Sequence, residues 1–171
     1  ALSYKLIRLI NNTGKRYTRK VRTIKQALVM IGLSDLRRWL FVITMKDLMD
    51  YKRPDIFKEL LEQSLYRAKV CNILALRKRL ENHSEYFLMG LFSLIDTILS
   101  RPMEKILGQM PLSEDIARTL LGRETSMSAY LTFSIALVNA DFEKAILLGE
   151  QLQLSPADLL EIANEAERWA K

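Results

Sequence analysis

The chain has 171 residues, of which 49% are apolar and 27% are charged, which is typical of a globular protein with a sizeable core. No apolar run reaches the roughly 18 residues of a membrane-spanning helix, so we expect no membrane association. The single cysteine, Cys71, excludes an internal disulfide, and we expect it to be a buried thiol of a protein in the reducing cytoplasm.

The net charge of +6 is unevenly distributed along the chain. Residues 1–53 carry 13 Lys and Arg against 3 Asp and Glu, whereas residues 54–171 carry 13 against 17. Such an asymmetry bears on the partners of the protein surface and not on the fold.

Helical periodicity runs through the first 53 residues, without a convincing alternating strand. Apolar residues at helical spacing predict a helix over 2–12, and Gly14 follows it. A basic loop then extends to about residue 22. Two further helices are predicted over 23–32, which Thr23 can cap and Gly32 ends, and over 35–50.

The same periodicity predicts helices through the remainder of the chain. They cover residues 54–80, 84–99, a short segment after Pro102, 114–121, 126–139, 141–152 and a last helix from 156. The start of the last helix is marked most clearly, because Ser155, Pro156 and Asp158 combine an N-cap, a first-turn proline and an acid at the third position.

The predicted architecture is therefore all-α, a multi-helix bundle of about nine helices with short loops. We find no internal repeat and no change in composition that would mark a domain boundary, so we expect residues 1–171 to form a single domain. The first residue is Ala and a helical pattern begins at once, so we expect the chain to be a fragment of a longer protein.

Three stretches carry a resemblance to a known family. They are residues 2–12 with 21–32, residues 86–96, and residues 110–124. Together they resemble the HDOD family, the regulatory relatives of HD phosphohydrolases that have lost the catalytic residues. The resemblance covers nearly the whole chain and implies a helical fold related to the HD domain.

The resemblance also locates a degenerate metal site. In the HD superfamily the His-Asp pair that binds metal falls just after Gly-Leu-x, and here Gly90-Leu91-Phe92 is followed by Ser93 and Leu94. A hydroxyl is a poor metal ligand and a leucine is none, and the chain has one histidine, His83. Because an HD site needs several imidazole ligands, we expect no bound metal, no cofactor, no catalytic residue and no enzymatic activity.

The stretch 110–124 looks like the form of the family found C-terminal to EAL domains, the fold of cyclic di-GMP phosphodiesterases. This implies a bacterial cytoplasmic signalling protein with an upstream EAL-type domain. It also implies that the chain is a scaffolding module in cyclic di-GMP-linked regulation, which acts through protein partners.

The basic loop offers a second candidate site. It contains six cations, namely Lys15, Arg16, Arg19, Lys20, Arg22 and Lys25. We expect first a solvated surface, second a docking site for an acidic protein, and third a phosphate-binding site for nucleotide or nucleic acid, with Tyr17 available for stacking. The alternative function is thus a nucleotide- or nucleic-acid-binding regulatory domain.

Asp96 follows Ser93 by three residues, so a continuous helix would place both on one face. That pair is either a remnant polar pocket or simply a local hydrogen bond or solvated face, and we favour the second interpretation.

Overall fold

The computed structural model describes residues 54–108, 110 and 112–170. Most of these residues belong to one compact unit, residues 55–106 and 112–171, which we describe by itself. The three helices predicted before residue 54 lie outside the described residues. The single domain expected over 1–171 therefore stays a prediction.

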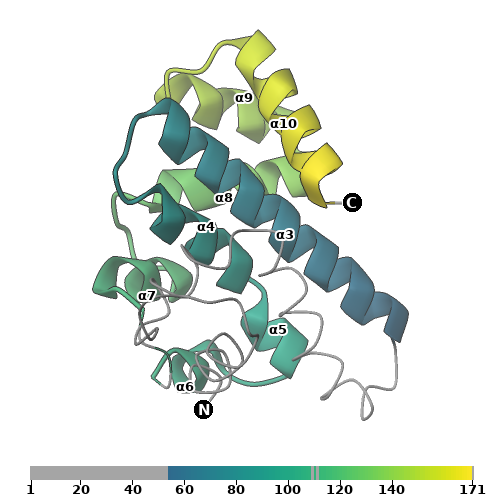
Figure 1. Cartoon of the computed structure of the whole chain (residues 1–171), viewed down its shortest axis with the longest axis vertical. Helices are drawn as coiled ribbons and strands as arrows, with labels where there is room; N and C mark the ends of the chain where they lie inside the picture. Colours follow the sequence, from purple (N-terminus) through teal and green to yellow (C-terminus); the bar gives the residue numbers. More distant parts are fainter. Residues whose placement is uncertain (1–53, 109, 111, 171) are drawn as a thin grey trace, which may run out of the picture. The chain divides into compact units, whose positions relative to one another are not determined.

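The described part of the chain is helical, and it contains no strand (Figure 1). Its helices are α3 (Pro54–Arg77), α4 (His83–Phe92), α5 (Ile95–Leu99), α6 (Met103–Leu107), α7 (Glu114–Leu120), α8 (Ser128–Val138), α9 (Phe142–Gln151) and α10 (Pro156–Ala170). The all-α class predicted from the sequence is confirmed over these residues.

The core forms where α3, α8, α9 and α10 meet. Their buried apolar side chains come from all four helices, namely Val70, Ile73, Leu74, Phe133, Ala136, Ala145, Leu152, Ile162 and Ala166. Phe133 and Ile162 are fully buried, and burial of such side chains is the main favourable term in folding. Figure 1 shows α3 as the long helix beside which α4, α8 and α10 are arranged.

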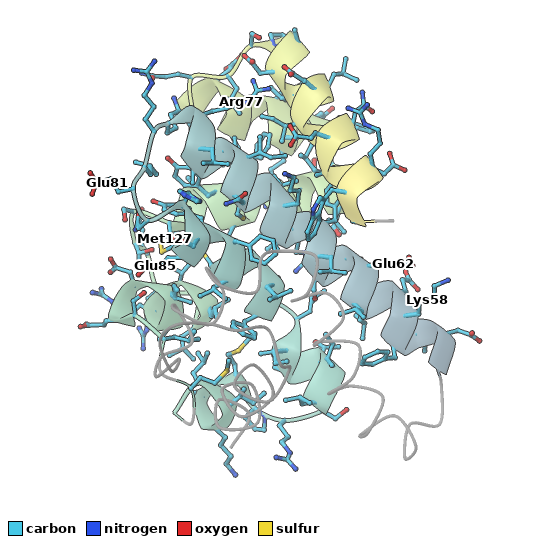
Figure 2. All side chains as sticks on the ribbon, viewed as in Figure 1. Lys58, Glu62, Arg77, Glu81, Glu85 and Met127 are labelled. Atoms are coloured by element: carbon cyan, nitrogen blue, oxygen red, sulfur yellow. The ribbon has the colours of Figure 1, made fainter. Side chains whose placement is uncertain are left out.

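Polar contacts hold the start of α10 against the end of α3. Arg77 forms ion pairs with Asp158 and Glu161, and Figure 2 labels Arg77 near the C-terminal end of α3. Asp158 also accepts hydrogen bonds from the N–H and Oγ of Ser155 at 2.8 and 2.6 Å, while its own N–H donates to Ser155 Oγ at 3.2 Å. This is the reciprocal cap that the sequence predicted.

Two predicted helices differ from the structure by more than two residues or by a break. The helix predicted over 54–80 ends at Arg77, because Arg79 adopts a left-handed backbone with φ of 56°. The N–H of Leu80 then donates to the carbonyl of Ala75, a helix ending usually made with glycine. Without a glycine in the sequence, nothing marked this end.

The second difference concerns the helix predicted over 84–99. It begins one residue earlier, at His83, and breaks after Phe92 into α4 and α5. The break falls on Ser93 and Leu94, the two residues that the family resemblance had singled out.

Candidate functional site at the α4–α5 corner

Ser93 and Leu94 form the break between α4 and α5, which we call the α4–α5 corner. Ser93 closes α4, and Leu94 precedes α5 with φ of −122° and ψ of 13°, outside the helical region. The Ser93 hydroxyl donates to the carbonyl of Gly90 at 2.7 Å. It therefore gives this carbonyl, which also accepts from the Ser93 N–H at 3.3 Å, a second donor at the end of α4.

Gly90 brings α4 into backbone contact with α3. A Cβ added at Gly90 would lie 2.6 Å from the Cα and N of Ala68 and 2.7 Å from the carbonyl carbon of Arg67. These atoms belong to the backbone and cannot rotate away. The glycine before the degenerate pair is thus required by helix packing.

Arg67 lies behind the corner, in the middle of α3. Only 7% of its surface is exposed, and its Nη1 donates to Ser93 Oγ at 3.3 Å. Among the described residues its Nε has no hydrogen-bond partner, and one turn earlier the buried hydroxyl of Ser64 has none either. Burial lowers the pKa of Arg67, but a guanidinium keeps its charge inside proteins.

The corner is therefore unsuited to a metal ion. A hydroxyl and an aliphatic side chain stand at the ligand positions, and a guanidinium beside them would repel a divalent cation. Within the residues that the structure describes, no group of three His, Cys, Asp or Glu side chains is placed to hold a metal.

A hollow of about 430 Å³ opens beside the corner. Its lining comes from the end of α4, from α7 and the turn after it, and from α8, namely Ser93, Thr119, Leu120, Gly122, Arg123, Glu124, Ser128, Leu131, Thr132 and Ile135. The hollow thus joins the degenerate position to three other segments of the unit.

The hydroxyls in this hollow already have structural roles. Thr119 Oγ1 donates to the carbonyl of Asp115 at 2.6 Å, and Thr132 Oγ1 donates to that of Ser128 at 2.9 Å. The ionisable side chains in the lining are Arg123 and Glu124, which are exposed and of opposite charge. No hydroxyl among these lining residues is paired with a base, so the lining contains no activated nucleophile.

The histidine and the acid considered in the sequence serve local structure. Nδ1 of His83 lies 3.2 Å from the amide nitrogen of the buried Asn72, which also donates to the His83 carbonyl. Asp96 accepts a hydrogen bond from its neighbour Thr97 at 3.4 Å. The helix face expected to hold both Ser93 and Asp96 does not exist, because the corner lies between them.

Cys71 is fully buried, as predicted. Its Sγ donates to the carbonyl of Tyr130 at 3.6 Å, and burial raises the pKa of the thiol to about 12. A thiol held in its protonated form is a poor nucleophile.

The structure places Ser93 and Leu94 together but leaves the other candidate site untested. The basic loop residues Lys15, Arg16, Arg19, Lys20, Arg22 and Lys25 lie outside the described residues. Sequence reasoning missed Arg67, although one signal was available. It occupies a position in the inner stripe of α3 between Ser64 and Cys71, where a charge is unusual.

The sequence matches the HDOD domain over residues 1–136. This chain belongs to the HDOD domain family. The match includes the α4–α5 corner and most of α8, whereas α9 and α10 lie beyond it. The family is generally non-catalytic.

Two relatives align with essentially the whole chain. One is the uncharacterized protein YuxH of Bacillus subtilis, 31% identical over 99% of this chain and 41% of its own length. The other is the cyclic di-GMP phosphodiesterase CdgJ of Vibrio cholerae, 32% identical over 100% of this chain and 39% of its own length. The chain thus spans about two fifths of the length of either relative. No solved structure matches it significantly.

None of the helices in the described part of the chain combines the length and the apolar character that crossing a bilayer requires.

Proposed function

We propose that this HDOD domain is a non-catalytic signalling module that acts by binding a protein partner. The observation that carries the proposal is the contact between Arg67 and Ser93. At the place of the ligand pair, a hydroxyl ends a helix and a buried cation lies against it, so the residues present serve packing and not metal chemistry.

The signalling role draws on the family and on one relative. The chain belongs to the HDOD family, and the relative from Vibrio cholerae is a cyclic di-GMP phosphodiesterase more than twice as long as this chain. The proposed context is therefore a bacterial cytoplasmic regulator in which an EAL-type domain precedes this one. A change in that domain would alter how the HDOD surface meets its partner.

Affinity capture tests this proposal. The purified 171-residue chain is immobilised, incubated with nuclease-treated bacterial lysate, and washed at low and at high salt. We expect defined proteins to be retained at both salt concentrations, because a buried apolar interface depends little on ionic strength.

Retention of nucleic acid alone, lost steeply as salt rises, would overturn the proposal, since that slope reflects the number of neutralised phosphates. It would instead assign the function to the basic loop. A matched variant that replaces Lys15, Arg16, Arg19 and Lys20 with Ser serves as the control, because it should abolish nucleic-acid retention and leave protein retention unchanged.

A further inference from the structure

Helix α9 carries apolar side chains both on its buried side and on the side that is exposed. Its inner side, with Ala145 and Gly149 buried, packs against α8 and α10. On the outer side, Phe142, Ile146 and Leu147 remain 67, 50 and 58% exposed. Figure 1 shows that α8 and α10 are its neighbours in the bundle.

The outer face also carries two carboxylates, and Lys144 lies at its edge beside Leu147. At 100° per residue, Glu143 and Glu150 fall between the Phe142–Ile146 pair and Leu147. Both carboxylates are exposed, and neither forms an ion pair among the described residues. We call the two carboxylates and the three exposed apolar residues the α9 outer face.

This face differs from a scatter of single surface hydrophobes, which needs no explanation. Three large apolar side chains share less than three turns of one short helix. The helix lies beyond the HDOD match over residues 1–136 but within the stretch that both relatives share with this chain. The face therefore belongs to a segment that accompanies the family domain in these proteins.

We infer that the α9 outer face binds a basic amphipathic helix of a partner protein. The inference rests on the proposed function and specifies the partner. An apolar stripe on such a helix would cover Ile146 and its neighbours, and Lys or Arg beside the stripe would neutralise Glu143 and Glu150.

The same charges disfavour two other occupants. If a second copy bound by antiparallel pairing about a two-fold axis near residues 146 and 147, Glu143 of one copy would face Glu150 of the other, and like charges repel. An anionic membrane surface would be repelled by both carboxylates.

The test uses the full chain and two synthetic helical peptides in fluorescence anisotropy. Both peptides carry a leucine stripe, flanked by lysines in one and by glutamates in the other. We expect wild type to bind the lysine peptide more tightly than the glutamate peptide, and the variant Glu143→Lys/Glu150→Lys to reverse this preference. Ile146→Ser should weaken binding of the lysine peptide about tenfold or more, a change that corresponds to about 1.4 kcal/mol. Leu160→Ser, which alters a leucine of α10 that is more exposed than Ile146, should leave binding unchanged.

Equal binding of the two peptides, or undiminished binding by Ile146→Ser, would overturn the inference. So would a dimer in sedimentation that the Ile146→Ser variant loses, since the face would then join two copies. Repeating the lysate capture with this variant separates the two proposals. If wild type and variant retain the same proteins equally, the proposed function is supported and the assignment of the binding site to α9 is wrong. If wild type retains no protein, the proposed function itself is wrong.

Discussion

At the scale of single residues, the contact between Arg67 and Ser93 determines what the degenerate site is. A buried cation that lacks a full set of partners costs free energy, and a small hydroxyl that accepts from it lowers that cost. Ser93 also donates to Gly90. The residue in place of a histidine ligand therefore links a buried charge to a helix end.

Substitutions of Ser93 and Arg67 should have different effects on the free energy of unfolding. Ser93→Ala removes the acceptor of Arg67 Nη1 and should lower the free energy of unfolding by about 1–3 kcal/mol. Arg67→Met replaces the buried cation with an apolar chain of similar length and should be neutral or stabilising. Urea denaturation of both variants measures the difference, and a loss with Arg67→Met as large as with Ser93→Ala would contradict this account of the corner.

Cys71 makes the folded state sensitive to alkaline pH. Its folded pKa of about 12 exceeds the value of about 8.5 in an unfolded chain, so the unfolded state releases its proton first. Stability is complete below about pH 8.5 and falls as pH rises towards 12, with a limiting slope of about 1.4 kcal/mol per pH unit.

The contribution of the Cys71 thiol to this pH dependence of stability can be measured with the variant Cys71→Ala. Urea unfolding between pH 8 and 10.5 should show a shallower decline for Cys71→Ala than for wild type. Burial also raises the pKa of Tyr66 to about 12, so some decline should persist above pH 10 in the variant. Identical pH dependence in the two proteins would show that the thiol is not held protonated by the fold.

At the scale of helices, the approach of α3 to α4 should be the least tolerant contact of the corner. Gly90→Ala places a methyl group 2.6 Å from the backbone of Ala68, and overpacking of this kind costs about 1–3 kcal/mol. The matched control is Gly149→Ala in α9, whose methyl group would have side-chain carbons of Leu159 as its nearest neighbours, at 3.0–3.5 Å.

The control should change stability much less, because Leu159 can rotate and alanine favours a helix over glycine by about 1 kcal/mol. Thermal and urea unfolding of the two variants provide the comparison. Equal stability of Gly90→Ala and Gly149→Ala would mean that the two helices are not in backbone contact at this point.

The helix ends also indicate what could be read from the sequence. Asp141 accepts a hydrogen bond from the N–H of Lys144, and Ser155 pairs with Asp158; both starts were predicted because caps are local. The end at Arg77 and the break at Ser93 were missed. The first depends on a non-glycine residue with positive φ, and the second on a side chain bonding to its own helix.

At the scale of the whole molecule, the all-α class followed from periodicity, and the family from three sequence stretches. The contact between Arg67 and Ser93 could not be predicted in this way, because the two residues are 26 positions apart and meet only once α3 and α4 have packed. The α9 outer face was likewise missed, since which apolar residues remain exposed is decided by the neighbours of a helix. The basic loop lies outside the described residues and stays a prediction.

The central claim is that the place of the metal-ligand pair has become a structural corner. Its most direct test restores the pair as Ser93→His/Leu94→Asp and measures metal content by mass spectrometry after incubation with Mn²⁺ or Fe²⁺ and dialysis, with wild type alongside. We predict no stoichiometric metal in either protein, because the described residues place no group of His, Cys, Asp or Glu side chains to complete the site and Arg67 opposes a second cation. One equivalent of metal held by the double variant would contradict the claim, since an otherwise intact metal site would then lie beside the corner.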